Sequence, residues 1–265
     1  MRIVNKKEKN QKDNWRLLGL EVNNASMNMA IDEAIMHCYA KGEVQNTIRF
    51  YRWHPSAVSI GYFQSVEEEV NIDFCRKMQI DIIRRITGGG AVYHDYNGEI
   101  TYSLIVDEKN QIIPADILKS YEVICKGLVA GLRDLGVEAK FSPINDIVIK
   151  GKKISGNAQT RRYGVLLQHG TVLIDSNISK MFNVLRISNE KISDKIIKNI
   201  EDRVTNLRRV LHRKIEFEEV FFALKSGFEK SLQISLKEDD LTDNERQLAF
   251  QLEKKFLDKS WIFRR

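Results

Sequence analysis

Residues 84–95 read RRITGGGAVYHD and place three consecutive glycines between a pair of arginines and a His-Asp pair. Glycine loses more conformational freedom on folding than other residues, so each glycine costs up to about 1 kcal/mol relative to alanine inside regular structure. A chain keeps such a run where the backbone turns sharply or where another group must come very close. The β-branched run 80–86 predicts a strand that leads into the glycines, and 99–106 predicts another strand after them.

Two interpretations of the glycine run remain after the known phosphate-binding loops are excluded. No segment matches the GxxxxGK[ST] loop, and a dinucleotide fingerprint fails because Tyr93 stands where its last glycine should be. The run is either a hairpin that needs only positive φ angles, or a loop that lets a small ligand lie against backbone amides. The cationic and imidazole side chains beside it would suit anionic groups on such a ligand.

The composition is that of a globular protein. The chain has 265 residues, of which 43% are hydrophobic and 29% charged, enough for one large domain. No apolar run approaches the roughly 20 residues of a membrane helix, and the charged start lacks the apolar core of a signal peptide. Cys38, Cys75 and Cys125 have no disulfide or zinc-ligand spacing, which favours a reducing, cytoplasmic setting.

The formal net charge of +6 raises the question of nucleic acid. Lys and Arg alternate with Asp and Glu along the chain, and no zinc-finger, basic-zipper or RNA-binding pattern is present. We therefore expect no nucleic-acid partner and no membrane partner. A basic surface would instead attract an acidic protein.

Working outward from the glycines, the hydrophobic periods predict an α+β fold with mixed, largely antiparallel sheets flanked by helices. Segments 47–53 and 57–63 predict a pair of strands, and the runs within 146–174 predict a meander. Helical periodicity predicts helices over 27–41, 66–79, 117–135, 218–233 and 242–257. The expected organisation is a charged leader over 1–13 and a single domain over 14–265, whose part 176–265 is rich in helices.

A second polar cluster follows 50 to 85 residues after the glycines. Asn145-Asp146, the GKKISG turn at 151–156 and QHGT at 168–171 contribute an acid, lysines, small residues and a histidine. Singly, Asp146 could cap a turn, the lysines could be solvated, and His169 could be a core histidine. Together they suit the activation of a carboxylate by ATP, because an acid can hold Mg²⁺ and an ammonium can neutralise a phosphate. No Ser-His-Asp or Cys-His pairing is evident near either motif.

The two motifs, RRITGGGAVYHD and NDIVIKGKKISGNAQTRRYGVLLQHGTVLID, resemble the lipoate–protein ligase family of the biotin/lipoate protein ligase superfamily. RFYRWHPSAVSIGYFQ (49–64) is similar to that family's early strands. The resemblance implies a class II synthetase-like catalytic domain that joins lipoate and ATP, with Mg²⁺, into lipoyl-adenylate. The lipoyl group would then pass to a lysine of a lipoyl-carrier domain, such as those of 2-oxoacid dehydrogenases or the glycine-cleavage H protein.

The resemblance also implies roles for particular residues. Lys153 would be the catalytic lysine, Asp146 would hold Mg²⁺, and Val58, Ile60, Tyr62 and Phe63 would receive the acyl chain. The remaining expected residues would bind the substrate and the adenylate: Arg84, Thr87, Gly88, Gly89, Gly90, Val92, Tyr93, His94, Asn145, Ser155, Gly156, Ala158, His169, Gly170 and Thr171.

The main alternative is an octanoyltransferase of the same fold. Such enzymes carry the acyl group on a cysteine, which in the branch most similar to this chain precedes the KxSG turn. Here that stretch, GVEAKFSPINDIVIKGKK, has no cysteine, and a triple glycine replaces Gly-Gly-Arg. Both features favour the ligase, whereas TYSLIV and NAQTRRYGVLLQHG look like the transferase branch. A biotin ligase and a non-catalytic binding protein are the remaining alternatives.

The longest ligases of the family carry an additional C-terminal domain, for which 265 residues leave no obvious room. In two-part members that domain is a separate polypeptide needed for adenylation. The resemblance therefore predicts a separate accessory protein as a partner of this chain.

Overall fold

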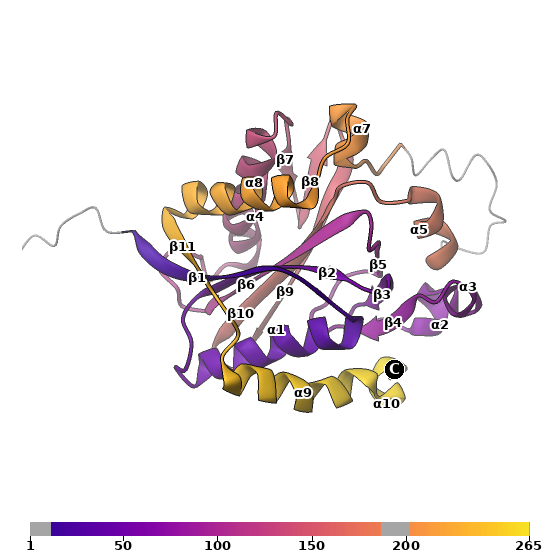
Figure 1. The fold of residues 1–265 in the computed structure, drawn as a ribbon, viewed down its shortest axis with the longest axis horizontal. Helices are drawn as coiled ribbons and strands as arrows, with labels where there is room; N and C mark the ends of the chain where they lie inside the picture. Colours follow the sequence, from indigo (N-terminus) through magenta and orange to yellow (C-terminus); the bar gives the residue numbers. More distant parts are fainter. Residues whose placement is uncertain (1–11, 187–201, 265) are drawn as a thin grey trace, which may run out of the picture.

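The computed structural model describes residues 12–186 and 202–264, and a long mixed sheet runs through it (Figure 1). The sheet has eight strands in the order β11-β1-β2-β6-β10-β9-β8-β7. β1 is parallel to both β2 and β11, and all the other neighbours in this sheet are antiparallel. The strands are β1 (Asp13–Asn23), β2 (Thr47–Trp53), β6 (Glu99–Asp107), β7 (Lys140–Ser142), β8 (Asp146–Ile149), β9 (Lys152–Arg162), β10 (Val165–Leu173) and β11 (Ile234–Asp239). The predicted α+β class and the predicted meander are confirmed.

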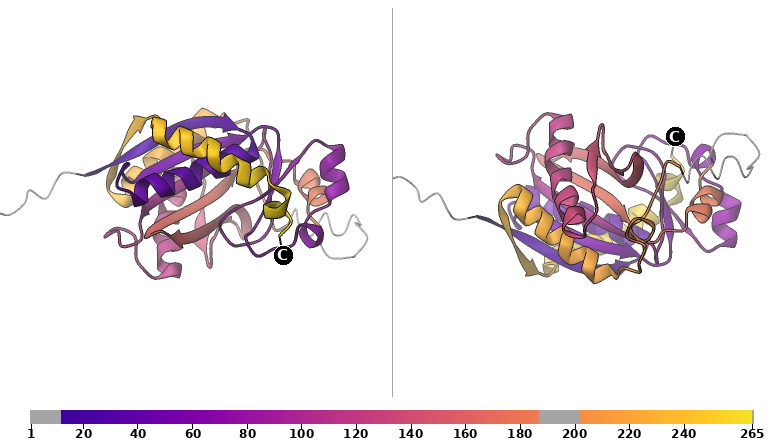
Figure 2. Two further views of the ribbon diagram at one scale, coloured as in Figure 1. Left: turned by 90° about the horizontal axis from the view of Figure 1, so that it is seen from below. Right: turned by 90° about the horizontal axis from the view of Figure 1, so that it is seen from above.

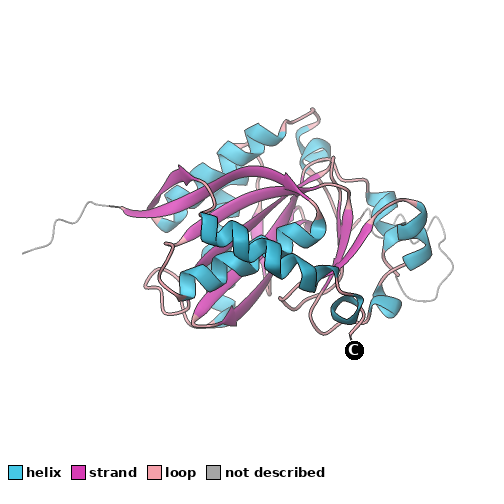
Figure 3. Ribbon diagram, turned by 60° about the horizontal axis from the view of Figure 1, so that its bottom comes forward, coloured by secondary structure: helices cyan, strands magenta, loops and turns pink. Residues whose placement is uncertain are grey.

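Two pairs of helices cover the two faces of this sheet (Figures 1 and 3). α1 (Ala25–Ala40) and α9 (Asp243–Leu257) lie on one face, and α4 (Ile117–Asp134) and α8 (Phe217–Leu232) lie on the other. Every residue of the central strand β10 is buried because both of its faces are covered. This explains why its sequence, VLLQHGTVL, lacks the alternation of a half-exposed strand.

The α1/α9 face is held to the sheet by a buried ion pair as well as by apolar packing. The Arg16 guanidinium on β1 donates to both carboxylate oxygens of Glu245, at 2.8 and 2.5 Å. Glu245 also completes a capping box with Thr242 at the start of α9, so one carboxylate both begins the helix and attaches it to β1.

On the other face, α4 and α8 approach each other through glycines. A Cβ on Gly227 of α8 would lie 2.3 Å from the carbonyl oxygen of Gly127 and 2.3 Å from the amide nitrogen of Gly131, both on α4. Neither atom belongs to a flexible side chain, so the two backbones can be this close only while residue 227 has no side chain.

A second, smaller sheet lies beside one end of the large one (Figure 2). Its order is β4-β3-β5, with β3 (Ala57–Ile60), β4 (Asp81–Arg84) and β5 (Val92–His94). The two strands predicted over 47–53 and 57–63 are present as β2 and β3, but they lie in different sheets, because the chain passes from one sheet to the other between Trp53 and Ala57. The other short helices are α2 (Val66–Glu69), α3 (Ile72–Lys77), α5 (Ile178–Val184), α7 (Leu207–Leu211) and α10 (Lys259–Ile262).

Three further boundaries differ from the sequence prediction. Residues 1–11 of the expected leader lie outside the described residues, and β1 begins at Asp13, inside the expected leader. The helix expected over 66–79 is two short helices, because Val70 is extended and forms a bridge with Leu185. The helix-rich part after residue 176 also contributes β11, the edge strand beside β1. None of the described helices has the length and apolar character that a membrane crossing requires.

The close approach of α4 and α8 predicts that Gly227→Ala destabilises the protein. Alanine is the better helix former by about 1 kcal/mol, but its Cβ would displace the α4 backbone, and overpacking of this kind costs typically 1–3 kcal/mol. We expect a lower urea midpoint by tryptophan fluorescence. Gly19→Ala is the matched control, because its Cβ would meet nothing within 4 Å. Equal midpoints for the two variants would show that the helices can separate without cost.

Candidate functional site

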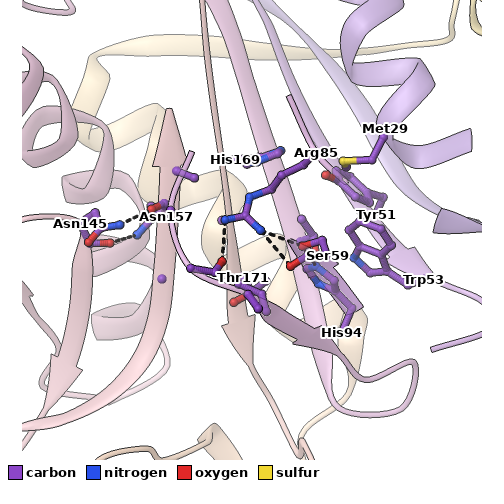
Figure 4. Close-up of a pocket in the computed structure, with 18 of the residues that line it drawn as sticks. Met29, Tyr51, Trp53, Ser59, Arg85, His94, Asn145, Asn157, His169 and Thr171 are labelled. Carbon is purple, nitrogen blue, oxygen red and sulfur yellow. Dashed lines mark hydrogen bonds between the residues drawn. The ribbon is translucent and has the colours of Figure 1, made fainter. Parts of the chain in front are cut away.

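A cavity of about 120 Å³ lies where residues of the large sheet, the small sheet and the glycine loop meet (Figure 4). Eleven of the residues expected from the sequence line it, and these are Gly89, Gly90, Val92, His94, Asn145, Lys153, Gly156, Ala158, His169, Gly170 and Thr171. The rest of its lining was not among the residues given a role, although Arg85 flanks the glycine run, and consists of Met29, Tyr51, Trp53, Ser59, Arg85, Ala91, Thr101 and Asn157. The two motifs, more than 50 residues apart, therefore border one small space.

Arg84 does not reach this cavity, contrary to expectation, whereas Arg85 does. Adjacent side chains leave a strand in opposite directions. The Arg84 guanidinium points away and donates to carbonyl oxygens of the loop 61–64 and of the C-terminal segment 261–264. Its role in the structure is to attach the C-terminal segment to the small sheet.

The remaining expected residues outside the lining are Thr87, Gly88, Tyr93, Asp146 and Ser155. Tyr93 is buried among apolar residues of the small sheet, since strand alternation turns it away from its neighbours Val92 and His94. Ser155 is buried but does not border the cavity. Thr87, Gly88 and Asp146 contact residues that do border it.

The three glycines wrap around the guanidinium of Arg85. Its Nη2 donates to the carbonyl oxygens of Gly88 at 2.8 Å and Gly90 at 2.7 Å. Gly89 has a φ of +91°, which side chains rarely adopt, and its carbonyl oxygen would lie 2.0 Å from a Cβ on Gly61. The positive φ of Gly89 confirms the hairpin interpretation of the run. The close contact in the structure is with the backbone at Gly61, so a ligand lying against the amides of the loop stays a prediction.

On one side of Arg85 lies a buried network centred on His169. The Nε2 of His169 is 2.7 Å from Thr87 Oγ1, and its Nδ1 is 3.4 Å from Asp32 Oδ2 on α1. Burial lowers the pKa of His169, although the Asp32 carboxylate opposes the shift. Burial would raise the pKa of Asp32, but bonding to His169 and the charge of Arg49 outweigh it, so the pKa is lowered. The network thus holds a carboxylate beside a neutral imidazole.

On the other side of Arg85 lies a second network of serine, histidine and glutamate. Ser59 Oγ is 2.8 Å from His94 Nε2, and His94 Nδ1 is 2.6 Å from Glu99 Oε1. The indole of Trp53 stacks on the His94 ring at 3.9 Å between centroids. No such pairing was evident from the sequence, and the structure corrects this expectation by bringing Ser59, His94 and Glu99 together. Ser59 precedes His94 by 35 residues on another strand, so that no local motif could reveal the pair.

Lys153 lies at a more exposed part of the cavity, with 43% of its side chain accessible. Its Nζ is 2.6 Å from Oδ1 of Asp146, so the expected metal-binding acid is already paired with a cation. Within residues 12–186 and 202–264, no group of three or more His, Cys, Asp or Glu side chains could hold a metal ion. Asp146 thus meets a cation of the protein itself, and no magnesium site is assigned to it.

Apolar side chains close the cavity at the end that lies against α1 and β2. They are Met29, Tyr51 and Trp53, of which none is more than 2% exposed. The expected acyl-chain residues do not border the cavity. Val58 and Ile60 are buried in the core of the small sheet, and Phe63 is 89% exposed. The i, i+2 spacing of Tyr51 and Trp53 on one strand was the available signal.

None of the chain's three cysteines borders the cavity. Cys125 is fully buried on α4, and burial raises the pKa of its thiol to about 12. Burial also raises the pKa values of Cys38 and Cys75 to about 11. All three thiols therefore stay protonated at neutral pH, where only the thiolate is a good nucleophile.

Because the pKa of His169 is lowered in the folded protein, the free energy of unfolding should decrease as the pH decreases. The unfolded chain takes up a proton near pH 6.5, whereas the folded state resists it, so stability is lost as the pH falls through that value. His169→Gln removes this titration. The loss of unfolding free energy between about pH 8 and about pH 5.5 should therefore be smaller in the variant than in the wild type, by at most about 1.4 kcal/mol per pH unit. Urea unfolding at both pH values measures it. His212→Gln, at an exposed position, should retain the wild-type difference. Parallel pH profiles for all three proteins would contradict the assignment.

Similarity to known proteins extends over most of the chain. The family model described as the lipoyl protein ligase A/B catalytic domain matches residues 24–229. The curated octanoyltransferase LipM of Kyrpidia tusciae is 37% identical over 95% of this chain and 99% of its own length. A bi-partite lipoate protein ligase of Thermoplasma acidophilum, solved with its E2 lipoyl domain, is 35% identical with a TM-score of 0.85, covering 96% of this chain and 97% of its own. A lipoate-protein ligase A bound with ATP is 32% identical with a TM-score of 0.82, over 94% and 98% of the two chains.

These relatives correct the expected activity. Three more full-length curated relatives, 32–36% identical, are also named octanoyltransferase LipM, so the expectation of an ATP-dependent, AMP-forming ligase is contradicted. The triple glycine was a poor criterion, because in the structure it surrounds Arg85 and says nothing about the acyl donor. The expected accessory polypeptide is likewise not supported. What the family model and the full-length relatives together establish is that this chain belongs to the lipoyl protein ligase A/B catalytic-domain family.

Proposed function

We propose that this protein is an acyltransferase that moves an octanoyl or lipoyl group from a thioester donor to a lysine of a lipoyl-carrier domain. The names of the full-length relatives support octanoyl transfer. The E2 lipoyl domain solved with the structural relative supports the class of acceptor. Lipoyl domains of 2-oxoacid dehydrogenases and the glycine-cleavage H protein are the acceptors to test.

The proposal rests on the lining of the cavity, which combines apolar side chains with cationic ones. Met29, Tyr51 and Trp53 form a buried apolar end that suits a medium-length acyl chain. Arg85 lies in the middle and Asn145 lies at the other end (Figure 4), and Lys153 also lines the cavity. An acyl chain bound in the apolar end would hold its carbonyl carbon near the cations and its leaving group toward Lys153.

This arrangement suits the transfer of an acyl group from sulfur to nitrogen. In the overall reaction a C–N bond to the acceptor lysine forms, the C–S bond breaks, and the amine proton ends on the released thiol. The step needs orientation and charge stabilisation, not a second activation, because the thioester is already reactive. The ammonium of Lys153 would neutralise the departing thiolate, and neither ATP nor Mg²⁺ takes part.

The charge of the protein fits its proposed acceptor. The chain has 42 Lys and Arg against 36 Asp and Glu. A net positive surface raises the association rate with an acidic domain and makes it sensitive to salt. The reaction should therefore slow as the ionic strength rises.

The test is an acylation assay with an unmodified lipoyl domain and an octanoyl-carrier protein, followed by intact mass of the acceptor. We expect one octanoyl group on one lysine without ATP. Lys153→Ala should lower kcat/KM by about ten- to a hundredfold. That is less than the 10²–10³ typical of a lost buried oxyanion donor, because Lys153 is partly solvated.

Lys152→Ala is the matched control, since its ammonium pairs with Asp202 and its side chain does not line the cavity. We expect that variant to keep wild-type activity. Acylation that occurs only with free lipoate and ATP, and never from the octanoyl thioester, would refute the proposal.

A further inference from the structure

The proposed transfer lacks the cysteine that would ordinarily hold the acyl group, yet the cavity contains an activated hydroxyl. We propose that Ser59 is the acyl-accepting nucleophile, with His94 as its general base and Glu99 as the residue that orients His94. This inference rests on the proposed function and names the covalent intermediate through which it proceeds. Ser59 and His94 both border the cavity, so they are within reach of a bound acyl donor.

The hydrogen bonds determine which atom carries each proton. Nη1 of Arg85 donates to Ser59 Oγ at 3.2 Å, so this oxygen acts as an acceptor there and its own proton is directed to His94 Nε2, 2.8 Å away. A carboxylate only accepts, so His94 Nδ1 donates to Glu99 Oε1 at 2.6 Å and leaves Nε2 free to receive the proton. This is the proton arrangement that a serine nucleophile requires.

Neighbouring side chains keep this arrangement rigid and dry. Trp53 stacks on the His94 ring, and its indole Nε1 donates to Thr101 Oγ1 at 2.7 Å. Thr101 in turn donates to Glu99 Oε1 at 3.0 Å. Ser59, His94 and Glu99 are 1%, 4% and 1% exposed. A preorganised, buried base of this kind needs little reorganisation during proton transfer.

Arg85 would stabilise the charge that develops. Its guanidinium is within hydrogen-bond distance of both the hydroxyl and the backbone carbonyl of Ser59, and its burial strengthens the field it exerts on them. Attack by Ser59 therefore creates negative charge beside a fixed cation that three other acceptors, on Thr87 and the glycine loop, hold in place.

The parallel network at Thr87 does not offer the same chemistry. Thr87 does not border the cavity, and the Asp32–His169 contact of 3.4 Å is longer than its counterpart. Asp32 is also bonded by Arg49, Tyr51 and Ser103, which attach α1 to the sheet. We therefore assign that network to the architecture and Ser59 to the reaction.

The reaction then has two balanced steps. In the first, Ser59 Oγ forms a bond to the acyl carbon, the C–S bond breaks, and the serine proton passes through His94 to the departing sulfur. In the second, the acceptor lysine nitrogen bonds to the same carbon, the ester C–O bond breaks, and a proton from the amine returns through His94 to Ser59. No oxidant, metal or nucleotide enters either step.

The experiment is a single-turnover reaction of the wild-type protein with octanoyl-carrier protein and no acceptor, followed by intact mass and peptide mapping. We expect one octanoyl group on the peptide that contains Ser59, discharged when the lipoyl domain is added. The ester should resist neutral hydroxylamine, which cleaves thioesters.

Three variants separate a chemical role of Ser59 from a structural one. Ser59→Ala should fold with an unchanged circular dichroism spectrum and lose at least about 10³-fold in activity. Ser59→Cys should still be acylated, and its adduct should become sensitive to neutral hydroxylamine, which a merely structural residue would not cause. Ser231→Ala, on α8 with its hydroxyl bonded to the Lys126 carbonyl, is the control and should match the wild type.

The outcomes distinguish this inference from the proposed function. An adduct on Cys38, Cys75 or Cys125, or acceptor octanoylation with no adduct on the enzyme, would overturn the role of Ser59 and leave the transferase intact. Absence of both the adduct and the acylated acceptor would refute the transferase itself, and the inference with it.

Discussion

The site depends on one buried cation, the guanidinium of Arg85. It is 4% exposed, and burial lowers its pKa to about 10, which still leaves it charged at neutral pH. A buried charge is tolerated only when its donors are satisfied. Arg85 meets this condition with five hydrogen bonds to Ser59, Thr87, Gly88 and Gly90. The conformation of the glycine loop and the lack of a side chain at Gly61 follow from that requirement.

The same cation connects the two layers that form the cavity. Ser59 belongs to the small sheet, whereas Thr87 bonds to His169 on the central strand of the large sheet. His169 contacts Asp32 on α1, and Asp32 bonds to Arg49 and Ser103 on two more strands. The polar groups of the site are thus continuous with those that fix α1 on the sheet. A change in this network should alter stability and the shape of the cavity together.

Because no thiol borders the cavity, a nucleophile in it would have to be a hydroxyl. A thiolate is a good nucleophile with little assistance, whereas a hydroxyl requires an aligned base and a nearby positive charge. The cavity supplies both to Ser59, through His94 and Arg85. These contacts are what would allow a serine to replace a thiol as the acyl-accepting group, as proposed for Ser59.

The sequence by itself determined the α+β class, because hydrophobic period is a local property. Its resemblance to a known family, carried by two motifs, supplied most of the expected residues that line the cavity. It could not decide between Arg84 and Arg85, since that depends on which face of β4 is covered. It also could not reveal the partnership of Ser59 with His94 and Glu99, or the apolar end made by Met29, Tyr51 and Trp53. Only the tertiary structure decided these features, because each joins residues from separate elements whose proximity results from how the sheets and helices pack.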